Sequence, residues 1–277
     1  MQRYFREVKQ LSRPDNITTN LIPIKFFAMV LLLAVFASPA AAFDFSGWDG
    51  LLKKYVKPTK LMGVALNGVD YPGMAKDPAY KELVRGLEKF SPASLKSRED
   101  KLVFWINVYN VMAVKMIIDH YPLDSIKDAG SLFTSVWKTD VGKIGGKVVT
   151  LNEIEHKILR KMGEPRIHVA IVCASVSCPD LRAEAYNVAQ LDAQLDDQMR
   201  QFLANPGKGM RLDIKKEKLY LSSIFDWFEE DFESKGGVGK FTFSYAPKSV
   251  QQEISRHSNP KKYKTDYLDY NWDLNKL

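Results

Sequence analysis

The chain has 277 residues, of which 45% are hydrophobic and 26% are charged, with two cysteines and a formal net charge of +7. This composition is typical of a globular protein and excludes a disordered, collagen-like or multi-span membrane chain. Two cysteines are too few for a disulfide-rich scaffold, and a chain of this length can bury a sizeable core without one.

The basic excess shrinks once the first 42 residues are set aside. They carry five basic and two acidic side chains, so the remaining chain has a net charge of +4 and no long run of Lys or Arg. Such a small excess gives no electrostatic footprint for nucleic acid. We therefore expect no nucleic-acid partner, and the sequence leaves the actual partners unknown.

The N-terminal segment has the pattern of a secretory signal peptide. An apolar run at residues 26–37 follows Lys25 and precedes an Ala-x-Ala end. This pattern predicts cleavage between Ala42 and Phe43 and an exported, periplasmic or secreted protein. The alternative is a signal anchor that stays in the membrane, but the run is short for a span of about 20 residues.

The remaining residues, 43–277, predict a single globular domain of the α+β (mixed α/β) class, with a small central sheet surrounded by helices. Helices outnumber strands, and no linker divides the chain. The glycines, prolines and aspartates of residues 63–78 predict a loop region with one short strand at best. Periodicity predicts helices near residues 48–56, 80–90, 98–120, 188–204 and 224–232, and strands near 147–151, 166–172 and 218–221.

The most apolar predicted helix runs from about Arg98 to His120. Ser97 and Asp100 form an N-terminal capping box, and Pro122 ends the helix. Because the helix is apolar nearly all round, we expect it to be buried in the middle of the domain. Its two Asn and one Lys would be costly in hydrocarbon, so we expect no stable membrane span in the mature protein.

Three polar side chains fall on the apolar faces of predicted helices. Asn107 and Asn110 share one face, and each buried amide needs hydrogen-bond partners. They either clamp neighbouring backbone, which we favour, or line a site. Glu155 falls inside the apolar arc of a helix that Asn152 can cap, whereas His156 lies well off that arc. Glu155 is either part of the cap, which we favour, or a tuned acid or base.

A continuous apolar run at residues 166–172 predicts a central, buried strand that starts after Pro165. The run contains His168 and leads into a stretch of small, polar and thiol residues between Cys173 and Cys178. Proteins that mix helices and strands place sites where buried strands end. We therefore predict the site at this end of the strand.

Several motifs together resemble one known family. They are Phe104–Asn110, Leu151–Arg160, Pro165–His168, Cys173–Pro179, Ile224–Phe228 with Asp231 and Phe232, and Leu268–Asn275. They span nearly the whole mature chain, and the sequence resembles the domain of unknown function 547 family, which occurs in exported bacterial proteins and in larger eukaryotic chains. The resemblance implies no established activity. Its members look alike at His168 and Cys173, whereas position 178 is Ser in many plant relatives, which weakens any mechanism that needs Cys178.

The first chemical interpretation is a thiol hydrolase or acyltransferase acting on peptide or amide bonds. Cys173 would be the nucleophile and His168 or His156 the base. Backbone N–H groups after Cys173 could hold an oxyanion. In a regular strand, His168 and Cys173 would point to opposite faces because they are five residues apart. The strand must therefore bend or end before the two side chains can meet. The candidates for orienting the base are Glu155, Asn107 and Asn110.

Other interpretations use the same residues differently. Cys173 and Cys178 can form a disulfide, which an exported compartment would favour. Together with His156 and His168 they offer zinc-type ligands, but the spacings match no standard signature, and we predict no metal and no cofactor. The main competing function is a non-enzymatic binding or structural module. Its groove would be lined by aromatic side chains: Trp105, Trp137, Trp227, Tyr270 and Trp272.

Overall fold

The computed structural model describes residues 42–130, 135–257 and 262–277, so residues 1–41 of the predicted signal peptide lie outside the described residues. The α-helices are α1 (Ser46–Tyr55), α2 (Tyr71–Lys76), α3 (Pro78–Lys89), α4 (Arg98–His120), α5 (Ile167–Ala170), α6 (Leu191–Ala204), α7 (Ile224–Trp227), α8 (Gly237–Tyr245) and α9 (Lys248–Ser255). The strands are β1 (Val56–Leu61), β2 (Val64–Val69), β3 (Asp140–Ile144), β4 (Lys147–Thr150), β5 (Met210–Asp213), β6 (Lys218–Ser222) and β7 (Lys264–Leu268).

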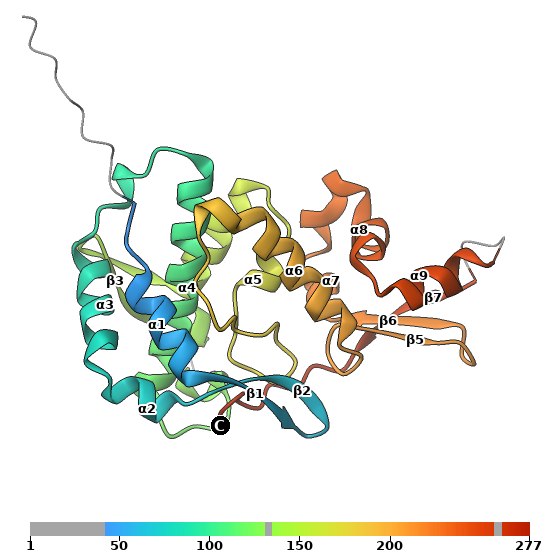
Figure 1. The fold of residues 1–277 in the computed structure, drawn as a ribbon, viewed down its shortest axis with the longest axis horizontal. Coiled ribbons are helices and arrows are strands. Elements are labelled where there is room, and N and C mark those ends of the chain that lie inside the picture. The colour runs from blue at the N-terminus through green and yellow to red at the C-terminus, as the bar shows by residue number, and fades with distance from the viewer. Residues whose placement is uncertain (1–41, 131–134, 258–261) are drawn as a thin grey trace, which may run out of the picture. The chain divides into compact units, whose positions relative to one another are not determined.

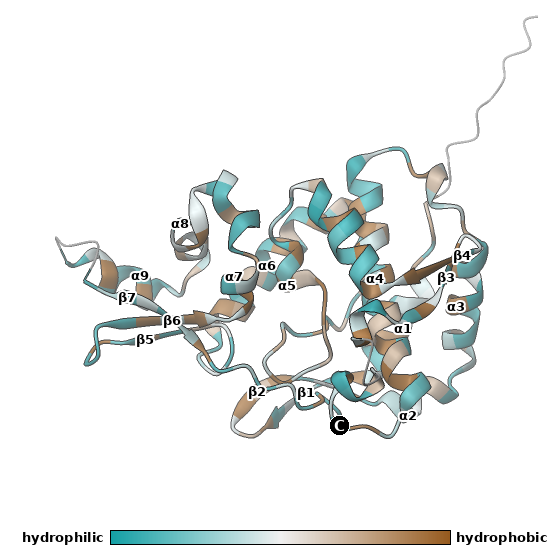
Figure 2. Ribbon diagram, turned by 180° about the vertical axis from the view of Figure 1, so that it is seen from behind, coloured by the Kyte–Doolittle hydropathy of each residue, from teal (hydrophilic) through white to brown (hydrophobic). Residues whose placement is uncertain are grey.

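The described residues mix helices with small sheets, which confirms the predicted fold class, but they do not share the one central sheet that the sequence predicts. The strands form three separate sheets: the antiparallel hairpins β1–β2 and β3–β4, and a three-stranded sheet in which β6 pairs antiparallel with β5 and parallel with β7 (Figure 1). Helices α1, α3 and α6 cover the cores with one apolar face each, and α3 turns mostly hydrophilic residues outward (Figure 2).

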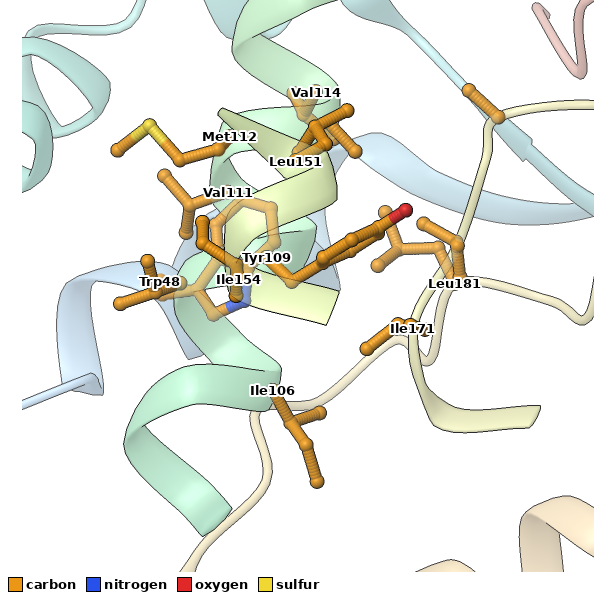
Figure 3. Close-up of a cluster of buried hydrophobic side chains, with 14 of the residues drawn as sticks. Trp48, Ile106, Tyr109, Val111, Met112, Val114, Leu151, Ile154, Ile171 and Leu181 are labelled. Atoms are coloured by element: carbon orange, nitrogen blue, oxygen red, sulfur yellow. The ribbon is translucent and has the colours of Figure 1, made fainter. Parts of the chain in front are cut away.

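Helix α4 is buried, as its sequence predicts. Ser97 and Asp100 form the expected capping box. Among the described helices, α4 is the one long and apolar enough to cross a membrane, and 83% of that stretch is buried inside the protein. Figure 3 shows side chains of α4 packing against Leu151 and Ile154 on one side and near Ile171 on another. Each fully buried aliphatic side chain contributes about 1.5–3 kcal/mol, so α4 organises the larger core.

Two hydrophobic cores meet at α5. The larger core is built around α4 and includes Ile167 and Ala170 of α5. The smaller core lies between α6, α7, α8 and the β5–β7 sheet, and it includes Val169 of the same short helix. Figure 1 shows α5 and the loop that follows it between these two groups of elements. The segment predicted to carry the site therefore lies where the two cores join.

The predicted strand at residues 166–172 is wrong, because residues Ile167–Ala170 form the helical turn α5. The backbone hydrogen bonds of this segment are local: the His168 N–H donates to the Pro165 carbonyl at 3.2 Å, and the Ile171 N–H donates to Ile167 at 2.9 Å. A short, fully buried apolar run does not distinguish a strand from a buried helix by periodicity. Its predicted burial is correct, because Ile167 to Val172 are all buried.

The loop predicted at residues 63–78 is also wrong. β1 and β2 form a regular hairpin in which Val56 pairs with Val69, and both turn residues, Met62 and Gly63, have positive φ angles of 50° and 84°. Such a two-residue turn matches the natural twist of paired strands. Helix α2 follows at once, and the Asp70 side chain caps it by accepting from the Gly73 N–H at 2.8 Å.

The helix predicted at residues 224–232 is broken. α7 ends at Trp227, Phe228 leaves the helical region with φ −120° and ψ 25°, and a 3₁₀ segment continues over Glu229–Lys235. The break lets Phe228 and Asp231 both face α5, as described below. β5, α8, α9 and β7 are elements that the sequence patterns do not predict.

Candidate functional site

A cavity of about 290 Å³ lies at the junction of the two cores and gathers four of the six predicted catalytic residues. Cys173, His168, Glu155 and His156 all line it, together with Cys178. The rest of its described wall is apolar or aromatic: Tyr109, Trp137, Ile171, Val172, Ile224, Trp227, Phe228, Tyr270 and Trp272. Cavities of this kind, with a few polar groups converging on an apolar pocket, are typical of small-molecule sites.

Cys173 is half-buried in the cavity wall, and its sulfur is surrounded by hydrogen-bond donors. Its Sγ lies 3.2 Å from the Ser175 Oγ and 3.1 Å from the Tyr270 hydroxyl. Burial raises the pKa of the Cys173 thiol, but hydrogen bonds from Cys178, Ser175 and Tyr270 outweigh burial and leave its pKa below the usual value. Donors aimed at a sulfur favour the thiolate, which is the nucleophilic form.

Cys178 has the opposite character. It is buried, and its Sγ accepts the Cys173 backbone N–H at 2.8 Å. Burial and the neighbouring Cys173 raise the pKa of the Cys178 thiol well above its usual value. Both cysteines are free thiols in this structure, so the structure contains no disulfide between them. The Cys178 sulfur thus accepts from the Cys173 backbone, and its own retained proton can be donated to the Cys173 sulfur, a contact that lowers the pKa of Cys173.

The backbone that carries Cys173 is held by the C-terminal segment. Ala174 adopts a positive φ of 58°, which turns the chain sharply after the cysteine. The Val176 N–H then donates to the Asp273 carbonyl at 2.9 Å, and the Ser177 N–H donates to the Asn271 carbonyl at 3.2 Å. Of the backbone N–H groups after Cys173 that the sequence analysis offers as oxyanion donors, those of Val176 and Ser177 are therefore occupied by backbone carbonyls.

His168 is paired with an acidic residue that the sequence analysis does not select. Its Nε2 lies 2.7 Å from the Asp231 Oδ2, and its ring stacks on Phe228 with a centroid distance of 4.1 Å. Burial lowers the pKa of His168, partly offset by Asp231. A neutral ring that donates its Nε2–H to Asp231 leaves Nδ1 unprotonated and able to accept a proton.

Asp231 is itself fixed by Arg160. The Arg160 Nε and one terminal nitrogen lie 2.6 and 2.9 Å from the two Asp231 oxygens, and Arg160 also pairs with Glu230. Burial works to raise the pKa of Asp231, but hydrogen bonds from His168 and Arg160 outweigh it and hold this pKa well below its usual range. Asp231 is therefore ionised at neutral pH and orients the His168 ring.

His156 has a different role from His168. The Arg160 guanidinium lies 2.9 Å from the His156 Nδ1, and because arginine can only donate, this nitrogen is an unprotonated acceptor. Burial and the Arg160 charge lower the pKa of His156. The ring is therefore neutral and carries its proton on Nε2. His156 can donate a hydrogen bond to a bound molecule, but its basic nitrogen is occupied.

Glu155 does not cap its helix, contrary to the interpretation that the sequence favours. Residues Glu153–Leu159 form a π-helical turn, Asn152 makes no side-chain cap, and Thr150 with Glu153 caps this segment instead. Glu155 is buried and accepts the Tyr109 hydroxyl at 3.2 Å. Burial raises the pKa of Glu155 to about 7, although the hydrogen bond from Tyr109 opposes the shift. π-Helical turns often occur at functional sites.

Asn107 and Asn110 do not line the cavity, and they clamp backbone as the sequence analysis favours. Asn107 donates to the Tyr186 carbonyl at 2.8 Å and accepts the Tyr186 N–H at 3.1 Å. Asn110 donates to the Ala170 carbonyl at 2.9 Å and accepts the Val172 N–H at 3.0 Å. Asn110 thus connects α4 to the residues that immediately precede Cys173.

The aromatic residues form a continuous surface at the cavity. Trp227 and Trp272 stack with a centroid distance of 5.8 Å and an interplanar angle of 12°, and Tyr270 contacts both, at 4.8 and 4.5 Å. Trp137 meets Trp272 edge to face at 5.5 Å. Trp105, the fifth predicted member, lies elsewhere, against Phe104. We call Trp137, Trp227, Tyr270 and Trp272 the aromatic wall.

Within the described ranges, no group of three or more His, Cys, Asp or Glu side chains is arranged to hold a metal ion. The residues that the sequence analysis misses are the partners of the predicted ones. Asp231, Arg160 and the Tyr270 hydroxyl lie far along the chain from the groups they contact. Asp231 lies in one of the family-like motifs, and matching each histidine to acidic residues in those motifs would have selected it.

Comparison with known proteins gives one match. Residues 92–203 match the family model described as "Protein of unknown function, DUF547". This segment belongs to the DUF547 family. The matched segment contains Cys173, His168, Glu155 and His156, whereas Asp231 and most of the aromatic wall lie outside it. No curated protein and no solved structure matches this DUF547 chain.

Proposed function

We propose that this DUF547 protein is a thiol-dependent acyl-transfer enzyme, a hydrolase or acyltransferase acting on peptide or amide bonds, with Cys173 as its nucleophile. One observation carries the proposal: the Cys173 sulfur, which is hydrogen-bonded to Ser175 and Tyr270, lines the same cavity as His168, whose ring is paired with Asp231. A reactive thiol, an imidazole and a carboxylate that orients the imidazole are the parts that nucleophilic thiol catalysis requires.

The proposed chemistry has two stages. The Cys173 thiol gives its proton to His168 Nδ1 while its sulfur attacks the carbonyl carbon, and His168 gives that proton to the amine as the C–N bond breaks. The resulting thioester is attacked by water or an amine, which loses a proton to His168, and the C–S bond then breaks as His168 returns the proton to the Cys173 sulfur. Among the described residues, the sulfur hydrogen-bonds to Ser175 and Tyr270 and to neither imidazole. Catalytic hydrogen bonds often tighten only when substrate is bound.

Two further groups in the cavity suit this chemistry. The Nε2–H of His156 can donate to the oxygen that becomes negative during attack. Glu155, whose pKa is raised to about 7, is partly protonated at neutral pH and can donate to the leaving group. Their positions in the cavity wall support these roles without a metal ion or a cofactor.

Acetylation by p-nitrophenyl acetate tests the proposal. We expect a burst of p-nitrophenolate and one acetyl group on Cys173, located by peptide mass spectrometry. Cys173→Ser should abolish the burst, and His168→Ala should slow it by roughly 10²–10⁴-fold. The matched control is His257→Ala, since His257 is bonded to Glu253 away from the cavity. A burst that survives in Cys173→Ser, or acetylation confined to lysines, would show that Cys173 is not the nucleophile.

The competing function is a non-enzymatic binding module built on the aromatic wall. It shares the cavity but needs no reactive thiol, so the same experiment separates the two. Absence of acetyl transfer in folded wild-type protein, with Cys173 unmodified by the reagent, would favour the binding module. Circular dichroism on each variant excludes loss of fold as the cause.

We also propose that the protein is exported. The proposal rests on the apolar run at residues 26–37 and on the Ala-x-Ala end before Phe43. N-terminal sequencing of the protein from the medium or the periplasm should give Phe43 as the first residue. Recovery of mature protein with an intact Met1 would overturn it.

A further inference from the structure

The aromatic wall and the thiol share one residue. The Tyr270 hydroxyl lies 3.1 Å from the Cys173 sulfur, while its ring lies 4.8 Å from Trp227 and 4.5 Å from Trp272. A group that rests on the two indoles is therefore next to the nucleophile. Trp227 is also 47% exposed, which is unusual for so large an apolar side chain and leaves surface for a bound molecule.

The titratable groups around the cavity restrict the charge that a bound molecule can have. No Lys or Arg is among the described lining residues, and their titratable groups besides the thiols and tyrosines are Glu155, His156 and His168. His156 Nδ1 is committed to Arg160 and His168 Nε2 to Asp231, and burial lowers the pKa of both rings, so neither imidazole is a cation. A bound anion would thus be desolvated beside a carboxyl group with no cationic partner among the lining residues, and that is costly.

One cation lies against the aromatic wall from outside the lining. The Lys127 ammonium lies 3.8 Å from the centroid of the Trp272 ring. An ammonium at this distance is attracted by the ring face. Because Lys127 already supplies a cation to Trp272, a cationic ligand would meet a like charge at this ring.

We propose that the site takes acyl substrates with an uncharged ring beside the reacting carbonyl, and that this ring packs on Trp227 and Trp272. The proposal rests on the function proposed above, because it places the carbonyl next to Cys173. The cavity volume of about 290 Å³ suits one side-chain-sized group, at the lower end of the roughly 300–1,000 Å³ range of small-molecule sites. Tyr270 sets the distance between the ring and the sulfur.

Binding to the full-length Cys173→Ser variant tests the proposal without requiring chemistry. Three probes share a phenyl ring: N-acetylphenylalaninamide is uncharged, N-acetylphenylalanine is an anion, and phenylalaninamide is a cation at neutral pH. Isothermal titration calorimetry should show the uncharged probe binding at least about 10-fold more tightly than either charged probe.

Variants locate the binding surface. Trp227→Ala should weaken binding of N-acetylphenylalaninamide by about 10-fold, because it removes the exposed stacking surface. The control is Tyr121→Ala, which removes a 38% exposed aromatic side chain outside the cavity. Its affinity should equal that of the parent protein.

Four binding results would contradict the proposal. No heat at about 10 mM uncharged probe means that the wall binds no such ring. Equal affinity for the anion, lost in Lys127→Gln, means that Lys127 selects negative charge. Tighter binding of the cationic probe would mean that the aromatic wall recognises ammonium groups. An unchanged affinity in Trp227→Ala would mean that the phenyl ring binds away from Trp227. Selective binding without any acetylation of the wild-type protein would refute the proposed enzyme while leaving this recognition intact.

Discussion

Cys173 and Cys178 are neighbours in sequence with opposite thiol chemistry. Cys173 receives hydrogen bonds from Ser175, Tyr270 and Cys178, whereas Cys178 is buried and keeps its proton. Both thiols line the cavity, but the low-pKa thiol is half-buried whereas the high-pKa thiol is buried. This difference assigns the nucleophile to Cys173 and a supporting role to Cys178.

The Tyr270 hydroxyl can be tested as one of the donors that lower the Cys173 pKa. Tyr270→Phe removes one donor to the sulfur and keeps the ring, so the pKa of the Cys173 thiol should rise by about one unit. The pH dependence of Cys173 alkylation measures this value. Tyr267→Phe, on β7, is the matched control. An unchanged pH profile in Tyr270→Phe would show that this hydroxyl does not stabilise the thiolate.

Glu155 should make the protein less stable as the pH rises. Its pKa of about 7 in the folded protein lies above the unfolded value, so the folded state holds a proton that the unfolded state has released. The stabilisation is complete below about pH 4.5 and is lost as the pH rises to about 7, at a cost of about 3 kcal/mol.

Glu155→Gln removes this pH dependence because the amide stays neutral. Its free energy of unfolding in urea should be less dependent on pH between about 4.5 and 7 than that of the wild type, and higher at pH 8. Glu82→Gln changes an exposed carboxylate of α3 and should follow the wild type. Parallel wild-type and Glu155→Gln profiles would mean that Glu155 is ionised in the folded protein throughout this range.

At the scale of elements, α4 is predicted well because its own sequence determines it. Its cap, its apolar surface and the proline after it are all local features. The segment that carries His168 is mispredicted because an apolar run of this length fits a strand and a buried helix equally well. This segment packs against both hydrophobic cores, so its conformation depends on residues from other parts of the chain.

In the candidate site, too, the residues that local sequence identifies can be predicted, and the contacts between distant residues cannot. Cys173, His168 and Glu155 are found from sequence because thiols, imidazoles and carboxylates in apolar surroundings are rare. Asp231 is not found, and Tyr270 is found only as a groove residue and not as a partner of Cys173, because these contacts join residues distant along the chain. The π-helical turn that brings His156 to the cavity also escapes a helical wheel, which assumes α-helical geometry.

The two asparagines of α4 allow a matched test of how this helix positions the thiol. Asn107→Ala and Asn110→Ala each leave one buried carbonyl and one buried N–H without a partner, and each should lower the free energy of unfolding by about 2–4 kcal/mol. Only Asn110 clamps the backbone before Cys173. Asn110→Ala should therefore also change the alkylation rate of Cys173, and equal rates in both variants would contradict this role.

At the scale of the whole molecule, the site extends beyond the segment that matches the family model. Residues 92–203 supply the thiols and both imidazoles, whereas the residues after α7 supply Phe228 and Asp231, and the C-terminal residues 269–277 supply Tyr270. Isolated bridges join Ser175 to Leu274 and Val69 to Lys276. The C-terminal residues thus connect the Cys173 loop to the β1–β2 hairpin.

Leu274 tests this connection. Leu274→Ala removes a side chain that is 3% exposed and should destabilise the protein by roughly 2–5 kcal/mol. It should also loosen the Cys173 loop and raise the pKa of the Cys173 thiol, because Tyr270 moves with the same segment. Leu87→Ala in α3 is the control, because Leu87 is similarly buried but belongs to a helix that forms no bridge with the Cys173 loop. If both variants leave the Cys173 pKa unchanged, the C-terminal segment does not position the thiol.

The central claim is that Cys173 is a reactive thiol activated by its surroundings, and alkylation of the native protein by iodoacetamide tests it most directly. Peptide mass spectrometry after short exposures at a series of pH values gives the rate at each cysteine separately. The account predicts that Cys173 reacts with an apparent pKa below the about 8.5 of a free cysteine, that Cys178 stays unmodified, and that both react once the protein is unfolded. A native protein with reduced cysteines in which Cys173 resists alkylation, or reacts no faster than Cys178, would contradict it.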